Sequence, residues 1–573
     1  MKLLELDDDV LLSIFSHLYG TNALSVALTC SEAYRLVIPR VVAFIVCSSP
    51  DQLRRLHAYL RGHDGRARHV EDFELTLSAY YPLEYEVDEE STTLIDAHFI
   101  QACLVANILL QLIQAKGLHR LVLHQLHPLS QKDPRMIPAL LVLDGLSCMA
   151  LNMVGDCCIA AFQGASFSNL RTLVLRFHNG DRVAIGPLVD REPITYLPLL
   201  QLLSLLPKLH FLKLHFFTPD RWLDSHAVTA APSFPSIRQL ELEEATPAAL
   251  RLAQLCSNLA VLSIQLLHGV PGDTSISPPG RWPPLHRLEI RGLKELMCVK
   301  PFLQTIHHLE IMVDHICGLD HHMLKFILGL TKLETFRQAS PVSVSMTILP
   351  DMRAASFWSQ VAIDAPRLRV LDLRIAASAL LVDPRNWLII MPPCLGCLPL
   401  VSLSIRLPVD IALQARSVFS SRSVEERRQT ESAHSAVLIV GTEMIRQVIP
   451  TSIPTLRFFA LTGARAPTVF EEAATQSRDG DPASIWRGTG ADEALPEPEA
   501  DAIEELDRRQ PSPFMRVTTC RWRVVRTGEK SEWELLTIRK AAAIQQYIAD
   551  ADFEKIERLH EFLGTFEVQH DTT

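Results

Sequence analysis

The sequence predicts an α/β protein built from repeated strand and helix units, and three observations support this prediction. A short apolar pattern, apolar-x-x-apolar-x-apolar, recurs along most of the chain. Helical signals stand between its copies, such as Thr246-Pro247, a capping residue followed by a first-turn proline. The chain has 573 residues, of which 48% are hydrophobic, so it is too long for one compact core and too apolar for global disorder. A repeat array meets these conditions because each unit buries its apolar edge against the next.

In each copy of the pattern, the apolar residues at the fourth and sixth positions share one face of a strand, and the residues between them face the other way. The copies begin at Val41, Val70, Leu118, Leu170, Leu209, Ile237, Leu259, Leu285, Ile306, Leu333, Leu368, Leu400 and Leu456. Helices are expected within residues 94–115, from Thr246 onwards, and over residues 319–328. The alternative is a doubly wound nucleotide-binding fold, but the glycine-rich phosphate-binding patterns of that fold are missing from the sequence.

This array resembles leucine-rich repeats of irregular length, extending over residues 40–470. The resemblance implies a solenoid in which a curved parallel sheet carries helices on its outer side. Each unit then consists of a short strand and a returning helix or loop.

The N-terminal segment carries more apolar surface than its size can bury. Leu6, Val10, Ile14 and Leu18 recur every four residues, and a second stripe lies beside them. Asp7, Asp8 and Asp9 occupy the first turn, where the helix dipole favours negative charge. A second apolar helix follows over residues 23–29. Because about forty residues cannot enclose so much apolar surface, the segment is expected to bind a partner.

This segment resembles an F-box. Leu6 matches the opening leucine of that family, Asp9 its acidic position, and Ile14-Phe15 and Leu18 its apolar anchors; Ala23-Leu24, Cys30 and Tyr34 match positions in the second half. Two positions depart from the family pattern, since Asp7 replaces a common proline and Tyr34 lies one residue late. The resemblance implies a three-helix domain over residues 1–39 that binds a Skp-family adaptor and, through it, a cullin scaffold. The implied adaptor-binding residues are Leu6, Val10, Leu11, Ile14, Phe15, Leu18, Leu24 and Leu28.

The C-terminal part begins after an acidic segment over residues 471–513, which is expected to be flexible. The first forty residues of this acidic segment, 471–510, contain twelve acids and four bases. Residues 514–573 predict a hairpin around Thr527-Gly528-Glu529-Lys530 and then a helix from about Arg539 towards Leu563. Together these elements are expected to cap the array.

An F-box followed by leucine-rich repeats resembles the fungal substrate receptors of cullin-RING ubiquitin ligases. Such a receptor performs no chemistry, and it acts by raising the effective concentration of a protein substrate near the conjugating enzyme. The alternative is a repeat scaffold that binds proteins outside any ligase. The substrate is expected on the concave sheet face, with an acidic segment as the favoured chemistry because arginine pairs well with carboxylates. The residues expected to bind it are Arg120, His124, Arg176, Lys213, His215, Glu241, Arg287, Arg291, Arg374 and Arg406.

No catalytic motif appears in the sequence, and neither a metal nor a cofactor is expected. Cys394 and Cys397 have metal-ligand spacing without further ligands nearby in sequence, and Cys157-Cys158 is interpreted as core packing. The histidines between His307 and His322 are interpreted as ordinary repeat residues. Most of the net charge of −10 falls within residues 471–510, so the rest of the chain is nearly neutral and lacks the basic surface that sequence-independent nucleic-acid binding needs. Neither a membrane span nor a signal peptide is recognisable, so a cytoplasmic or nuclear location is expected.

Overall fold

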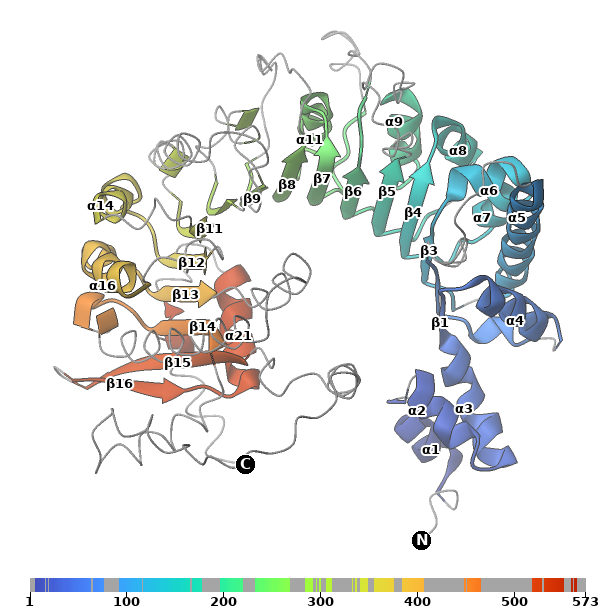
Figure 1. Cartoon of the computed structure of the whole chain (residues 1–573), viewed down its shortest axis with the longest axis horizontal. Coiled ribbons are helices and arrows are strands. Elements are labelled where there is room, and N and C mark those ends of the chain that lie inside the picture. Colours follow the sequence, from blue (N-terminus) through green and yellow to red (C-terminus); the bar gives the residue numbers. More distant parts are fainter. Residues whose placement is uncertain are drawn as a thin grey trace, which may run out of the picture. The chain divides into compact units, whose positions relative to one another are not determined.

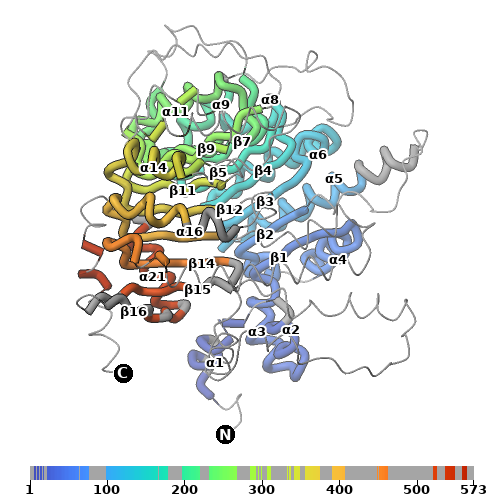
Figure 2. Tube along the Cα trace, turned by 60° about the vertical axis from the view of Figure 1, so that its left-hand side comes forward, coloured from blue at the N-terminus to red at the C-terminus, as the bar shows by residue number. Residues whose placement is uncertain are grey.

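The structure is a computed structural model of the whole chain (Figures 1 and 2). It describes residues 6–15, 17–18, 20–62, 65–76, 92–115, 117–164, 167–177, 196–219, 232–267, 284–291, 295, 298–299, 306–311, 332, 335–336, 341–348, 355–375, 384–406, 448–449, 451–464, 518–527, 530–550, 558–559 and 561–563. The helix expected over residues 319–328 and the acidic segment 471–513 lie outside this part of the chain. No helix within it is long and apolar enough to cross a membrane.

The chain is an α/β protein with a long, mostly parallel, open sheet, as the sequence predicts. It divides into two compact units. Unit 1 comprises Met1–Glu289 and Met297–Pro301, and unit 2 comprises Ile290–Leu296 and Phe302–Thr573. The division therefore falls inside the predicted repeat region of residues 40–470 rather than at one of its ends.

Unit 1 begins with three packed helices, α1 (Asp8–Phe15), α2 (Gly20–Ala27) and α3 (Ser31–Ala43). Figures 1 and 2 show them gathered beside the β1 end of the sheet. The Cys30 thiol caps α3 by accepting from the Ala33 N–H at 3.5 Å. Their shared core consists of Leu11, Phe15, Ala23, Ala27 and Val37. A small helical domain therefore precedes the sheet, and α3 runs directly into the first strand.

The strands of unit 1 pair in parallel and in chain order from β1 to β8. They are β1 (Phe44–Cys47), β2 (Asp72–Leu75), β3 (Arg120–Leu123), β4 (Cys148–Val154), β5 (Thr172–Phe177), β6 (Phe211–His215), β7 (Gln239–Ala245) and β8 (Val261–Leu266), followed by β9 (Arg287–Ile290) at the division. Each predicted copy of the pattern in unit 1 yields a strand. Strand β4 was not predicted from the sequence.

Helical segments connect these strands and lie along one face of the sheet in unit 1 (Figure 1). The α-helices are α4 (Pro50–Arg61), α5 (Thr92–Leu112), α6 (Leu126–Lys132), α7 (Met136–Leu141), α8 (Asp156–Ala161), α9 (Tyr196–Ser204) and α11 (Arg251–Leu255). Short 3₁₀ turns add η2 (Ala67–His69), η4 (Phe162–Gly164) and η6 (Pro247–Leu250). The helices expected within 94–115 and from Thr246 onwards are both present. Alternate strand residues such as Leu212 and Leu214 are fully buried against them.

Several strand ends in unit 1 share a left-handed residue that is not glycine. Gln125, Met153, Phe216 and Glu244 have φ between 50° and 57°. At Met153 and Glu244 the parallel register also shifts by one residue. Such a conformation disfavours a side chain, so its recurrence marks the place where the chain must turn sharply from strand to helix.

Unit 2 continues with parallel strands and ends in an antiparallel hairpin. Its strands are β10 (His308–Ile311), β11 (Ser343–Ile348), β12 (Val370–Ile375), β13 (Ser402–Arg406), β14 (Phe458–Ala464), β15 (Thr518–Thr527) and β16 (Lys530–Leu535). Its described helices are α14 (Ala355–Asp364), α16 (Pro384–Leu395) and α21 (Ile538–Asp550). The strand predicted from Leu333 is wrong, since Thr335 and Phe336 are helical and the strand forms at β11 instead.

The predicted C-terminal hairpin and helix correspond to β15, β16 and α21. The hairpin extends the sheet by pairing β15 with β14. The helix packs through Ile544 and Ile548 against Val370, Phe458 and Ala460. In β12 and β14 these three residues alternate with the core-facing Leu371, Phe459 and Leu461. Helix α21 therefore comes after the last strand in the chain and packs on the sheet face opposite the core helices.

Candidate functional site

The N-terminal helices leave an apolar face exposed. Val10 is 45% exposed, Ile14 39%, Leu24 41% and Leu28 73%. Val10 and Ile14 are four positions apart on α1, a spacing that places them on one side of that helix. Leu24 lies on α2, and Leu28 directly follows the helix and donates its backbone N–H to the Leu24 carbonyl at 3.0 Å. Four apolar side chains of this small domain are therefore exposed to solvent instead of being buried in its core. We call Val10, Ile14, Leu24 and Leu28 the exposed helical face.

The other expected adaptor-binding residues lie differently. Leu11 and Phe15 are only 1% exposed and hold the three helices together. Leu6 and Leu18 are half-buried and pack against the same core. Their role in this structure is internal packing, so the exposed helical face is the part of the predicted set that a partner can reach.

The second candidate surface is the sheet face of unit 1 opposite the core helices. Arg120 on β3 donates to Asp72 at 2.9 Å and to Glu74 at 3.0 Å, both on the neighbouring β2. Burial would lower the pKa of Arg120, but its hydrogen bonds to Asp72 and Glu74, together with the charges of these carboxylates, outweigh that effect and raise it. A predicted substrate-binding base is therefore already paired with two carboxylates of the same sheet.

A similar arrangement joins β6 to β7. The Lys213 ammonium lies 3.1 Å from Glu241 and 2.7 Å from Glu243, and His215 Nδ1 lies 2.7 Å from Glu243. The hydrogen bonds from His215 and Lys213 lower the pKa of Glu243 to about 2, although burial opposes this shift. Burial would lower the pKa of Lys213, but its bonds to Glu243 and Glu241 outweigh that effect and raise it. The charges on this part of the face compensate one another.

Two predicted residues of unit 1 differ from this pattern. Arg176 is exposed, and its guanidinium lies 5.1 Å from the centre of the Phe216 ring, within cation–π range. His124 contacts the Asn152 amide nitrogen at 3.0 Å, and burial lowers the pKa of His124. Arg176 therefore presents its charge towards solvent beside an aromatic ring.

Three of the four remaining predicted bases follow the paired pattern. Arg287 lies 2.8 Å from Glu289 in the same strand. In unit 2, Arg374 pairs with Glu310 at 2.8 Å, and Arg406 pairs with Asp372 at 2.7 Å. Arg291 directly follows β9. The expected preference for an acidic substrate assumed unpaired bases, and these ion pairs remove most of its physical basis.

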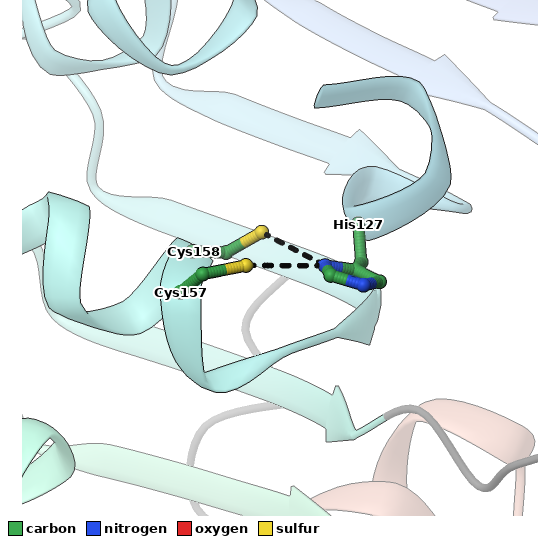
Figure 3. A group of neighbouring side chains, drawn as sticks. All are labelled: His127, Cys157 and Cys158. Atoms are coloured by element: carbon green, nitrogen blue, oxygen red, sulfur yellow. Dashed lines mark hydrogen bonds between the residues drawn. The ribbon is translucent and has the colours of Figure 1, made fainter. Parts of the chain in front are cut away.

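A third cluster, which was not predicted from the sequence, lies on the helical side of the sheet. Figure 3 shows His127 of α6 pointing towards Cys157 and Cys158 of α8. His127 Nδ1 lies 3.3 Å from the Cys157 Sγ and 3.9 Å from the Cys158 Sγ. Cys157 is exposed and Cys158 is buried, so packing alone does not account for both. Burial raises the pKa of Cys158.

The proximity of His127 to the two cysteines could have been predicted from the sequence by aligning the repeat units that contain them. Leu146, Met149 and Leu151 fit the apolar pattern, and Arg120 pairs with Cys148. This register aligns Gly155 with His127 and brings the two following cysteines beside it. Recognising β4 as a copy of the pattern would therefore have predicted the proximity.

The other sequence candidates for metal ligands are less favourable. The Cys394 and Cys397 thiols donate to the backbone carbonyls of Ala355 and Cys394, each at 3.7 Å. His308 begins β10 and His307 directly precedes it, while His315, His321 and His322 lie outside the described residues. Among the described residues, only His127, Cys157 and Cys158 bring three potential metal-ligand atoms together.

No protein family model matches the sequence, and no curated protein is significantly similar to it. The functional assignment therefore depends on the chain's own residues. Three features bear on it: the exposed helical face, the charge-paired sheet face, and the His127 cluster.

Proposed function

We propose that this chain is the substrate-recognition subunit of a cullin-RING ubiquitin ligase. Its N-terminal helices would bind a Skp-family adaptor, and its sheet would bind a protein substrate. The observation that carries the proposal is the exposed helical face on a three-helix domain whose sequence resembles an F-box. The protein would contribute proximity rather than chemistry, because ubiquitin transfer requires the substrate to be held near a charged conjugating enzyme.

The exposed helical face suits a protein partner because its four apolar residues stand around a formed core. Burying them on the adaptor would gain about 25 cal/mol for each Å² of apolar surface removed from water. Binding would not require the helices to unfold, since Leu11 and Phe15 already fill the interior. The proposal therefore assigns adaptor binding to Val10, Ile14, Leu24 and Leu28.

The decisive experiment measures binding of a purified Skp-family adaptor to the full chain. Ile14→Ala combined with Leu28→Ala should weaken binding by roughly tenfold or more, since central apolar anchors each contribute about 1–3 kcal/mol. Ile363→Ala is the matched control, because Ile363 is 68% exposed on α14, far from this domain in sequence. Unchanged adaptor affinity in the double variant would refute the assignment.

The alternative function is a repeat scaffold that never enters a ligase. It is supported by the same sheet and differs only in the partner of the N-terminal helices. Failure of the wild-type chain to bind any Skp-family adaptor, with the protein folded, would favour this alternative.

The substrate surface would be the unit 1 sheet face around Arg176. This arginine is exposed beside Phe216, while Arg120 and Lys213 are engaged by neighbouring acids. Among the described residues of this face, Arg176 is an exposed cation, the neighbouring Phe216 is only 8% exposed, and the charges of Arg120 and Lys213 are compensated. Such a surface suits a mixed polar segment better than a strongly acidic one. Photo-crosslinking from position 176 would locate substrates, and Arg54 on α4 provides a solvent-exposed control position.

A further inference from the structure

We propose that His127, Cys157 and Cys158 form a zinc site that links helices α6 and α8 of two successive repeat units. The three ligand atoms lie within 4.8 Å of one another (Figure 3). The chemical class of the ligand is a borderline or soft divalent cation, because two sulfurs and an imidazole nitrogen disfavour Mg²⁺ and Ca²⁺. This inference is independent of the proposed ligase function.

The distances fit tetrahedral zinc coordination. With Zn–S bonds of about 2.3 Å and Zn–N bonds of about 2.0–2.1 Å, a tetrahedral ion separates nitrogen and sulfur by about 3.6 Å. The observed separations of 3.3 Å and 3.9 Å lie on either side of that value. A zinc ion therefore requires movements of only a few tenths of an ångström at these two pairs.

Two polar side chains lie beside the proposed ligands. His127 Nε2 lies 2.9 Å from the Gln131 amide, and the Ser130 hydroxyl lies 3.5 Å from the Cys158 Sγ. Metal-bound histidines usually donate their other N–H to such a partner, which fixes the ring orientation. Zinc on Nδ1 needs the proton on Nε2. The Gln131 amide oxygen accepts a hydrogen bond from this Nε2–H once the amide oxygen and nitrogen exchange places.

Gly155 permits the close approach of the imidazole. A Cβ atom at position 155 would lie 2.7 Å from His127 Nδ1 and 3.1 Å from two ring carbons. Any larger residue would therefore displace the ring from the two sulfurs. Gly155 provides a test of the geometry that keeps every ligand atom.

Zinc binding at this site releases protons from the two thiols. The two thiols form two Zn–S bonds and lose two protons to the buffer, and neutral His127 forms the Zn–N bond. Two thiolates neutralise the charge of the ion. The site has three protein ligands, and because Cys157 is exposed, a water molecule can complete the tetrahedron.

The test is Zn²⁺ and Co²⁺ titration of the full chain, stripped with a chelator and kept reduced. We expect one equivalent of Co²⁺ to bind with thiolate charge-transfer absorption, and Zn²⁺ to displace it. Calorimetry in buffers of different ionisation heat should show proton release on binding. Zn²⁺ should raise the melting temperature of the wild-type protein.

Three variants locate the site. Cys158→Ser should abolish the charge-transfer band, and His127→Asn should weaken it strongly. Gly155→Ala should lower the affinity for Co²⁺ by roughly 10- to 100-fold, the range for a disturbed orienting shell. Gly164→Ala is its matched control, since an added Cβ there meets nothing within 4 Å. The double variant Cys394→Ser with Cys397→Ser controls for binding at other cysteines.

The experiment remains interpretable even if Cys158→Ser folds poorly, because Gly155→Ala retains all three ligands. The proposal is overturned by absence of Co²⁺ binding in the reduced wild-type protein. It is equally overturned if the affinity survives Gly155→Ala and His127→Asn unchanged, or disappears in the Cys394 and Cys397 double variant. A Cys157–Cys158 disulfide in protein isolated without reductant, with no metal binding after its reduction, would also overturn it.

Discussion

At the scale of single residues, Glu243 shows how the sheet face uses its charges for stability. Its carboxylate accepts from His215 and Lys213, both at 2.7 Å, and its pKa is lowered to about 2 from 4.5. The folded state therefore binds fewer protons at this group than the unfolded state does. The resulting stabilisation is complete above pH 4.5 and is lost as the pH falls towards 2.

Glu243→Gln should therefore lose up to about 3 kcal/mol of unfolding free energy above pH 4.5, and its stability should decline less between pH 4.5 and 2. Acid denaturation followed by circular dichroism measures both effects. Asp51→Asn is the control, because the Asp51 side chain is 71% exposed. Parallel acid-denaturation curves for wild type and Glu243→Gln would contradict the prediction.

Met153 provides a backbone prediction. Its φ of 56° is unfavourable for a β-branched residue but tolerable for asparagine. Met153→Val should therefore lower the unfolding free energy by about 1–2 kcal/mol relative to Met153→Asn. Thermal melts of the two variants compare them directly, and equal melting temperatures would show that the left-handed conformation carries no cost here.

At the scale of elements, helix α1 carries a core residue and a residue of the proposed adaptor-binding surface side by side. Phe15 is 1% exposed and Ile14 is 39% exposed. Phe15→Ala should cost about 3–5 kcal/mol of unfolding free energy in the helical domain, because it opens a cavity in the core. Ile14→Ala should cost little stability and act on adaptor binding. Hydrogen exchange of the α1 amides distinguishes the two, and comparable loss of protection would refute the separation.

The apolar pattern predicts most strands because burial of its fourth and sixth positions is what makes a repeat strand stable. The pattern gives a wrong prediction where a helical segment has apolar residues at the same spacing. It misses a strand where one of the apolar positions is occupied by another residue. Leu333 and Phe336 fit the pattern, yet Phe336 belongs to a helix. At β11 a proline, Pro341, occupies the first apolar position. The β4 copy lies beside a long apolar run, in which periodicity alone does not identify a strand.

The candidate sites were less predictable than the strands. Periodicity placed Val10 and Leu11 on one helix but did not determine which would be buried among α2 and α3. Alternation placed Arg120 on the sheet face, but its pairing with Asp72 and Glu74 follows from the lateral register between strands 48 residues apart. The His127 cluster likewise depends on register between consecutive units.

At the scale of the whole molecule, α21 limits where unit 2 can offer an open sheet face. Ile544 and Ile548 cover Val370, Phe458 and Ala460, and Leu559 and Leu563 join the same cluster. Substrate binding is therefore expected on the unit 1 sheet face around Arg176, where the described residues include no such helix.

The double variant Ile544→Asp with Ile548→Asp should detach α21, because two carboxylates would have to be buried in an apolar cluster. The freed apolar surface on β12 and β14 should increase binding of a hydrophobic dye and promote self-association, which light scattering detects. Ile363→Asp is the control, since that residue is already 68% exposed. The same dye binding and molecular mass as the wild type would mean that α21 remains seated despite the charges. Detachment without aggregation would instead mean that another part of the chain covers the sheet, because Phe458 and Val370 alone expose too much apolar surface to remain solvated in isolation.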